Sequence, residues 1–114
     1  MIDQVRPAAL SAWIAQAQAS DAKAVVLDVR EAWELQTASV QPEGFALMHI
    51  PMGELGHRLA ELDPTHSIAC LCHHGGRSQR VALFLEQQGF TRLANVAGGI
   101  NAWAIECDHT IPRY

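Results

Sequence analysis

Cysteine is scarce in this chain, and the few cysteines do not form a disulfide pattern. Three thiols, Cys70, Cys72 and Cys107, occur among 114 residues, an odd number that cannot pair completely within the chain. Small secreted domains that are stapled by disulfides carry more cysteine than this. The scarcity excludes a disulfide framework and favours a reducing compartment, so we expect a cytoplasmic protein.

Positive charge is also scarce. Lysine and arginine number 8 against 12 acidic residues, which gives a net charge of −4. Proteins that bind nucleic acid or anionic membranes carry basic patches that attract phosphate groups. We therefore expect neither nucleic acid nor a membrane as a partner.

Long apolar runs, repeats and low-complexity segments are absent as well. No apolar run approaches the roughly 20 residues that a membrane-spanning helix needs. The N-terminal segment carries Asp3 and a short apolar stretch broken by Ser11, which argues against a signal peptide. With 49% hydrophobic and 18% charged residues, the composition is typical of a globular protein. We expect residues 1–114 to form a single domain.

What the chain does contain is an alternation of β-prone runs with helical patterns. The β-prone runs cover residues 24–29, 45–50, 67–71 and 93–96. Helical patterns begin near Pro7, cover residues 31–36, 52–62 and 77–88, and resume after Gly99. Such alternation indicates βαβ units with right-handed crossovers. The sequence therefore predicts a three-layer α/β fold in which a mostly parallel sheet is covered by helices on both faces.

One segment combines a thiol, two imidazoles, two glycines and a cation between a strand and a helix. It reads Cys72-His73-His74-Gly75-Gly76-Arg77-Ser78 and is called the Cys72 loop below. Glycines permit positive φ, so backbone N–H groups can converge at the positive end of the following helix. Such an anion cradle favours a thiolate. Cys72 is therefore the candidate nucleophile.

Other side chains near this loop have two interpretations each. Asp28 and Arg30 follow the strand at 24–29, and the carboxyl ends of parallel strands share one edge of a sheet. They either lie beside the Cys72 loop or form an ion pair that fixes loops. His73 and His74 either adjust protonation or contact substrate, or are simply exposed.

Metal binding is the least favoured use of this region. Cys70, Cys72, His73 and His74 contain the atoms that zinc prefers, but alternate strand residues followed at once by a turn cannot easily surround a tetrahedral ion. We expect no metal and no other cofactor. His49 alternates with apolar neighbours and is interpreted as a half-buried, hydrogen-bonded histidine.

Three segments together resemble the rhodanese domain. They are Leu27-Asp28-Val29-Arg30-Glu31, Cys72-x-x-Gly75-x-Arg77-Ser78 and Val96-x-Gly98-Gly99-Ile100-x-x-Trp103. The resemblance covers nearly the whole chain and implies a central five-stranded parallel sheet with helices on both sides. It departs from the family where many members have Gly-His-Ile-Pro-Gly-Ala, since this chain has Met48-His49-Ile50-Pro51-Met52-Gly53. We expect this departure to alter the pocket wall formed by residues 38–53 and the substrate preference.

The resemblance implies sulfur transfer by double displacement. Cys72 would take sulfane sulfur from a small donor, thiosulfate or a persulfide, and hold it as a persulfide. A thiol or cyanide would then accept the sulfur, and the acceptor could also be a protein. The Cys72 loop would bind substrate through its backbone. Arg77 would meet the sulfonate end of thiosulfate or stabilise the thiolate, the alternative being an arginine that faces solvent.

Two further functions remain open. The domain could be a persulfide carrier or a redox-sensing binding module with little turnover. It could also be a relative of the cysteine-dependent phosphatases and arsenate reductases, which share the fold. Their motif places five residues between nucleophile and arginine, whereas four separate Cys72 from Arg77. This spacing favours sulfur transfer.

Overall fold

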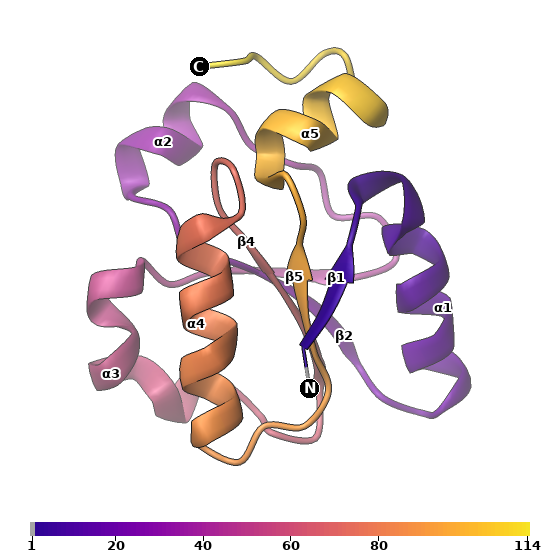
Figure 1. The fold of residues 1–114 in the computed structure, drawn as a ribbon, viewed down its shortest axis with the longest axis vertical. Helices are drawn as coiled ribbons and strands as arrows, with labels where there is room; N and C mark the ends of the chain where they lie inside the picture. Colours follow the sequence, from indigo (N-terminus) through magenta and orange to yellow (C-terminus); the bar gives the residue numbers. More distant parts are fainter. Residues whose placement is uncertain (1) are drawn as a thin grey trace.

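The computed structural model describes residues 2–114 and contains a five-stranded sheet between two layers of helices (Figure 1). All strand pairs are parallel, and the order across the sheet is β1-β5-β4-β2-β3. The strands are β1 (Ile2–Val5), β2 (Ala24–Asp28), β3 (Ala46–His49), β4 (Ser67–Leu71) and β5 (Leu93–Val96). The helices are α1 (Leu10–Ala19), α2 (Ala32–Thr37), α3 (Leu55–Arg58), α4 (Gly76–Gln87) and α5 (Gly99–Glu106). Short 3-10 turns are η1 (Pro7–Ala9), η2 (Met52–Glu54) and η3 (Leu59–Glu61). The predicted three-layer α/β fold is confirmed.

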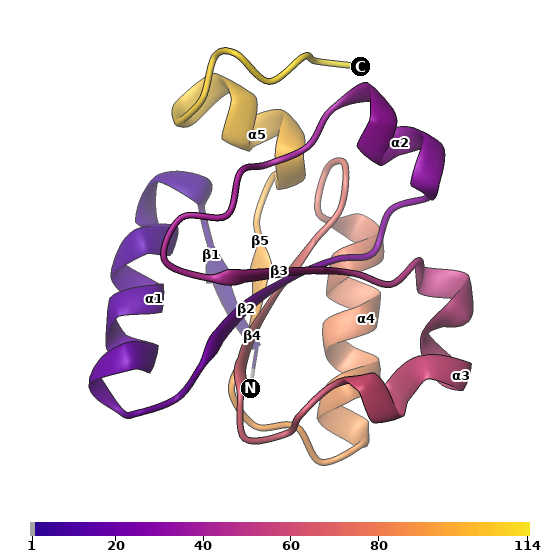
Figure 2. The same ribbon diagram turned by 180° about the vertical axis from the view of Figure 1, so that it is seen from behind.

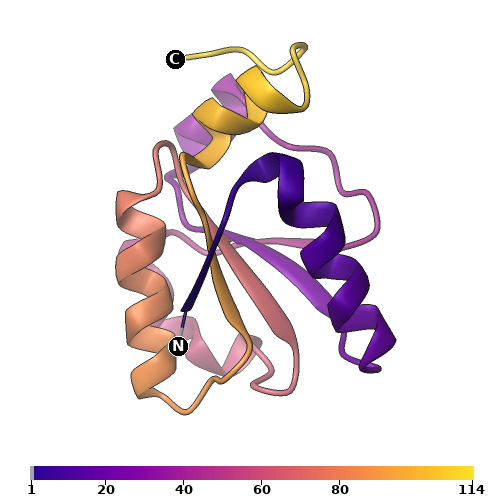
Figure 3. The same cartoon turned by 45° about the vertical axis from the view of Figure 1, so that its right-hand side comes forward.

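Period-two alternation along the strands divides the apolar residues between two cores. Val26, Leu71 and Val96 face the layer that contains α1 and α5. Leu27, Cys70 and Leu93 face the layer that contains α3 and α4. Figure 3 shows α1 and α4 on opposite sides of the sheet. Strands β2 and β4 are buried along their whole length because both of their faces are covered.

β1 is the strand that the residue patterns did not predict. It spans only Ile2–Val5, of which Val5 alone is buried, and it pairs with β5 at the edge of the sheet. Its two central residues, Asp3 and Gln4, are exposed and are not β-prone. Pairing with β5, rather than local preference, therefore fixes this strand.

The continuous helix expected over residues 52–62 is wrong in detail. The segment forms η2, α3 and η3 in succession, and only Leu55 and Leu62 of its apolar residues are fully buried. Gly53 and Gly56 interrupt the pattern, and each glycine lowers helix stability by roughly 1 kcal/mol relative to alanine. Leu55 and Leu62 therefore reach the core from a succession of short helical turns and not from one continuous helix.

The Cys72 loop follows β4, the middle strand of the sheet, and turns into α4. Figures 1 and 2 show this loop between α2 and α5 at the carboxyl edge of the sheet. Ligands of open parallel sheets bind at this edge. No helix within residues 2–114 has the length and apolar character that a membrane crossing requires.

Candidate active site

Cys72 lies at the bottom of its loop with its sulfur surrounded by donors. The residue is 1% exposed, and Sγ accepts hydrogen bonds from the backbone N–H groups of Gly75 (3.0 Å) and Ser78 (3.4 Å). The Ser78 hydroxyl is 3.2 Å from the same sulfur. Two amides aimed at one sulfur atom at the start of α4 form the predicted anion cradle. The arrangement can stabilise negative charge on Cys72 or on a sulfur atom bound to it.

Gly75 makes the tight turn of the loop possible, and Gly99 allows α5 to pack against it. Gly75 has φ of +105° and precedes α4, a backbone conformation that residues with a Cβ rarely adopt. Gly76, by contrast, is the first residue of α4, so only the first of the two glycines has positive φ. A Cβ on Gly99 would collide with the carbonyl oxygens of Cys72 and His73. The close approach of α5 to the loop therefore requires glycine.

The amino end of α5 holds the loop from the other side. The N–H of Ile100 donates to the carbonyl of Cys72 over 2.9 Å, and the N–H of Asn101 donates to the carbonyl of His73 over 3.1 Å. The first N–H groups of a helix have no partner within the helix, so the loop carbonyls satisfy them. This contact explains why the second Gly-Gly pair accompanies the first in the sequence.

Arg77 is bound to Glu34 of α2 and does not face solvent freely. Both terminal nitrogens of Arg77 donate to the two carboxylate oxygens of Glu34, each over 2.7 Å. The Glu34 side chain is 4% exposed. The hydrogen bonds from Arg77 lower the pKa of Glu34 to about 2, so the carboxylate is charged at neutral pH. The Arg77 side chain is 32% exposed and is paired with Glu34, and its contact with a donor or with the Cys72 thiolate stays a prediction.

Asp28 and Arg30 form the ion pair that was one of their two interpretations. Arg30 is 0% exposed, and its guanidinium binds Asp28, with the closest pair of atoms 2.7 Å apart. It also donates to the backbone carbonyls of Glu34 (3.3 Å) and Ala38 (2.9 Å). These bonds leave Arg30 occupied with the α2 segment. The pair lies at the same edge as the Cys72 loop because the N–H of Val29 donates to the Leu71 carbonyl at the end of β4.

His73 and His74 form an aromatic stack with Tyr114. The ring of His73 lies 3.9 Å from that of His74 and 3.8 Å from that of Tyr114 between centroids, the latter pair being nearly parallel at 3°. Burial lowers the pKa of His73, and His74 lowers it further, so His73 is neutral at neutral pH. Within residues 2–114 its buried Nε2 has no hydrogen-bond partner. Of the two, His74 is the exposed one, as expected for at least one of them.

Three residues of the site were missed in the sequence: Glu34, Asn95 and Tyr114. Glu34 binds Arg77, Asn95 accepts a hydrogen bond from Ser78, and the Tyr114 hydroxyl donates to Glu34 over 2.9 Å. None belongs to a local motif of catalytic residue types. For Glu34 the sequence carries a local signal, because Glu31 and Glu34 have the spacing of a capping box at the start of α2, but that spacing does not predict Arg77 as the partner.

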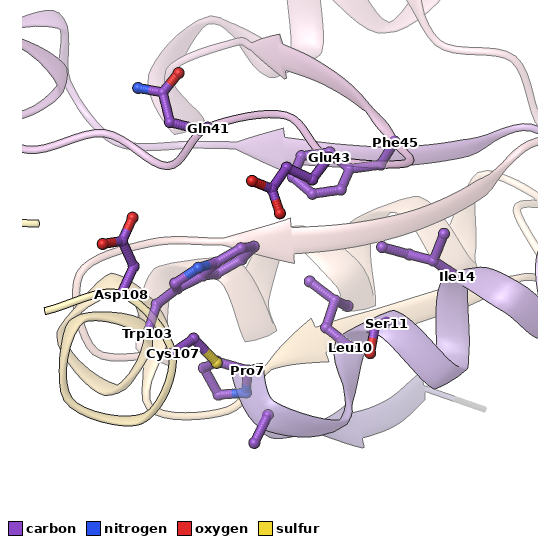
Figure 4. Close-up of a pocket in the computed structure, with 11 residues that line it drawn as sticks. Pro7, Leu10, Ser11, Ile14, Gln41, Glu43, Phe45, Trp103, Cys107 and Asp108 are labelled. Carbon is purple, nitrogen blue, oxygen red and sulfur yellow. The ribbon is translucent and has the colours of Figure 1, made fainter. Parts of the chain in front are cut away.

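The other two cysteines lie outside the Cys72 loop. Cys70 is fully buried in β4, and burial raises its pKa to about 12, so it stays a neutral core thiol. Cys107 is exposed beside a cavity of about 300 Å³ (Figure 4). The cavity is lined by Pro7, Ala8, Leu10, Ser11, Ile14, Gln41, Glu43, Phe45, Trp103, Cys107 and Asp108, none of which belongs to the Cys72 loop. His49 is half-buried and pairs with the Arg30 carbonyl at 2.6 Å, as expected.

Comparison with known proteins identifies a family match over most of the chain. The model of the rhodanese-like domain matches residues 11–106. A rhodanese-related protein from Thermoplasma volcanium has a similar structure, with a TM-score of 0.74, 31% identity and coverage of 92% of this chain and 93% of that one.

Two proteins of Bacillus subtilis are similar in sequence. YrkF, provisionally named as a sulfur carrier, is 37% identical over 84 residues, which cover 74% of this chain and 43% of YrkF. YtwF, provisionally named as a sulfurtransferase, is 33% identical over 84 residues, which cover 74% of this chain and 77% of YtwF. The chain thus spans less than half the length of YrkF.

Proposed function

Since the chain belongs to the rhodanese-like domain family, we propose that it is a sulfurtransferase that carries sulfane sulfur as a persulfide on Cys72. The observation that supports this most is the pair of backbone N–H groups that meet at Cys72 Sγ at 3.0 and 3.4 Å. Fixed donors stabilise charge where it develops without having to reorganise. Relatives named for sulfur carriage and sulfur transfer support the same general function.

The reaction would have two displacements. In the first, the Cys72 thiolate attacks the outer sulfur of thiosulfate; a new S–S bond forms, the bond to the central sulfur breaks, and sulfite leaves with its electron pair. In the second, a thiolate or cyanide attacks the outer sulfur of the persulfide, and Cys72 leaves as a thiolate. Each step conserves electrons, so no redox cofactor or metal is needed.

The proposed donors and acceptors follow from the chemistry of the sulfur that Cys72 would carry. Thiosulfate and small persulfides both present an outer sulfur to Cys72, and thiols or cyanide can remove it. A protein thiol is a further candidate acceptor, since YrkF, a relative that is 37% identical over 84 residues, is named for carrying sulfur. All three cysteines are free, which suits a compartment that keeps thiols reduced, such as the cytoplasm.

A thiocyanate assay tests the function. With thiosulfate and cyanide, the wild-type protein should form thiocyanate catalytically, and Cys72→Ser should reduce this to the background rate because a hydroxyl cannot form a persulfide. Cys107→Ser is the matched control and should retain the activity, since Cys107 lies outside the loop. Thiocyanate formation by Cys72→Ser at the wild-type rate would refute the proposal. One slow turnover per protein would instead indicate a carrier.

A further inference from the structure

A chain of hydrogen bonds connects the sulfur of Cys72 with the protein surface. The Ser78 hydroxyl lies 3.2 Å from Cys72 Sγ and 2.5 Å from Asn95 Oδ1. Asn95 Nδ2 donates to Gln4 Oε1 over 3.0 Å, and Gln4 Nε2 donates to Gln79 Oε1 over 2.7 Å. Ser78 and Asn95 are buried, whereas Gln4 is exposed. The chain therefore runs from a buried sulfur to side chains in contact with water.

Strand register places Asn95 where it can make this connection. Asn95 on β5 lies opposite Gln4 on β1 and opposite Cys70 on β4. Its side chain consequently points to the face that α4 covers, among apolar neighbours. A buried amide there is costly unless both its donor and its acceptor are used. Ser78 donates to the amide oxygen of Asn95, and Gln4 accepts from its amide nitrogen.

The Ser78 hydroxyl has one proton, and its direction depends on Asn95. With a carbonyl oxygen at 2.5 Å, the hydroxyl donates to Asn95. It then presents only lone pairs to the sulfur 3.2 Å away. Those lone pairs can accept a hydrogen bond from a neutral thiol. The arrangement in the structure is therefore the one that suits Cys72 as a thiol.

When Cys72 is a thiolate, the hydrogen bond between Ser78 and the sulfur must run in the opposite direction, from the hydroxyl to the sulfur. Once the thiol proton has left to water, the Ser78 hydroxyl must turn to donate to the negative sulfur. Asn95 can support this turn by rotating its amide by half a turn, so that Nδ2 faces Ser78 and Oδ1 faces Gln4. Oxygen and nitrogen of an amide have nearly the same shape, so the rotation needs no repacking. Gln4 is exposed and can rotate in the same sense, and rotation of the Gln79 amide then turns its nitrogen toward Gln4 Oε1.

We propose that Asn95 is a positioning residue that allows this hydrogen-bond chain to reverse when Cys72 changes from a thiol to a thiolate or persulfide. Asparagine fits the role because it can present either an acceptor or a donor to Ser78, whereas aspartate only accepts and leucine does neither. This role rests on Cys72 being the reactive group of the proposed function. It concerns ionisation, however, and can be tested without any sulfur donor.

The pH dependence of alkylation tests the role of Asn95. Iodoacetamide is reacted with each variant in a Cys107→Ser background, and peptide mass spectrometry measures the alkylation of Cys72 separately from that of Cys70, whose pKa burial raises to about 12. Asn95→Asp should move the midpoint of the rate profile to higher pH by about one unit, since it holds the hydroxyl away from the sulfur. Asn95→Leu should move it to lower pH by about one unit, since Ser78 is then free to donate to the thiolate.

A surface variant tests the same chain without a change in the core. The carboxylate introduced by Gln4→Glu can only accept hydrogen bonds. It therefore keeps Asn95 Nδ2 directed toward residue 4 and Asn95 Oδ1 directed toward the Ser78 hydroxyl. The midpoint should rise by roughly half a pH unit, and the rise should persist in 1 M salt, where the Debye length is about 3 Å. Gln87→Glu adds the same charge at the exposed end of α4 and should leave the profile unchanged.

Opposite shifts for Asn95→Asp and Asn95→Leu, with a rise for Gln4→Glu, are the expected result. Shifts of both Asn95 variants in the same direction would show that Asn95 merely supports the packing, and would overturn the proposal. So would a Gln4→Glu profile that matches the wild type. If both core variants fail to fold, as judged by circular dichroism, the Gln4→Glu result alone decides. Because no sulfur donor is present, failure of sulfur transfer leaves this test intact.

Discussion

Arg77 and Glu34 meet through two parallel hydrogen bonds of 2.7 Å, although they are 43 residues apart in the chain. Arg77 belongs to the Cys72 loop and is the second residue of α4, and Glu34 belongs to α2. The pair therefore ties the loop to the segment that follows β2. A bidentate arginine–carboxylate pair fixes orientation as well as distance, so it also restrains the turn that presents the backbone N–H groups to Cys72.

Removing the charge of Glu34 should destabilise the protein near neutral pH and much less in acid. The pKa of Glu34 is lowered from an ordinary value of 4.5 to about 2, mainly by hydrogen bonds from Arg77. A depressed pKa stabilises the folded state above the unfolded pKa, and this contribution is lost as pH falls toward 2. Glu34→Gln should thus lower the free energy of unfolding by about 2–3 kcal/mol at pH 7. Urea unfolding between pH 7 and pH 2.5 measures the difference.

Glu61→Gln is the matched control for this change. Glu61 also pairs with an arginine, Arg58, but both lie at the surface and are screened by water. Its replacement should alter stability very little at any pH. A Glu34→Gln deficit that stays constant down to pH 2.5 would contradict the assignment of the low pKa to Glu34.

Arg77→Ala should impair sulfur loading from all donors to a similar degree. Both terminal nitrogens of Arg77 are occupied by Glu34, so its removal leaves a buried carboxylate without its cationic partner and loosens the loop. Loading rates from thiosulfate and from an uncharged persulfide, followed by mass spectrometry, should fall by similar factors of about 10 or more. A loss specific to thiosulfate would show instead that Arg77 leaves Glu34 to bind the sulfonate.

Tyr114 should have two separable effects. Its hydroxyl accepts from Arg30 and donates to Glu34, both over 2.9 Å, while its ring stacks on His73. Tyr114→Phe should cost about 1 kcal/mol of stability and keep the ring stack. Tyr114→Ala should also expose His73 and raise its pKa, which burial holds below the ordinary value.

The imidazole resonances of His73 in NMR spectra measure this difference. Assignment uses His73→Gln as a reference spectrum. The pKa of His73 should rise in Tyr114→Ala and stay near the wild-type value in Tyr114→Phe. An unchanged titration in Tyr114→Ala would show that Tyr114 does not cause the burial of His73.

The sequence predicted those parts of the fold whose cause is local. The run at 67–71 forms β4, as predicted. The Cys72 loop forms because Gly75 can adopt positive φ, and Gly89, also at positive φ, follows the end of α4. β1 was missed because its conformation depends on pairing with β5. Its residues alone do not favour a strand.

The missed site residues share this dependence on distant contacts. Glu34, Asn95 and Tyr114 act on residues 43, 17 and 80 positions away, respectively, and no spacing rule covers such distances. Arg77 illustrates the consequence, since its position was predicted and its partner was not. The partner decides whether its charge is available to a donor.

Hydrolysis of phosphate esters should remain at the background rate. Four residues separate Cys72 from Arg77, and Arg77 is held by Glu34 rather than extended over the cradle. A phosphate needs several oxygens bound at once beneath such an arginine. p-Nitrophenyl phosphate should therefore be stable under conditions in which thiosulfate loads Cys72. Hydrolysis faster than sulfur loading would favour the phosphatase alternative.

A glycine inserted between Gly76 and Arg77 tests the loop length further. One residue adds up to about 3.3–3.6 Å of chain, enough to displace Arg77 from Glu34. The insertion should reduce sulfur loading substantially. Loading at the wild-type rate would show that the short loop and its arginine anchor are not required.

Intact-protein mass spectrometry after brief exposure to thiosulfate tests the central claim most directly. The account predicts that the wild-type chain gains the mass of one sulfur atom, that cyanide or a dithiol removes it, and that fragmentation locates it on Cys72. Cys107→Ser should gain the same mass, and Cys72→Ser should gain none. A wild-type chain that gains no sulfur, or sulfur that is found on Cys107 and persists in Cys72→Ser, would contradict the account.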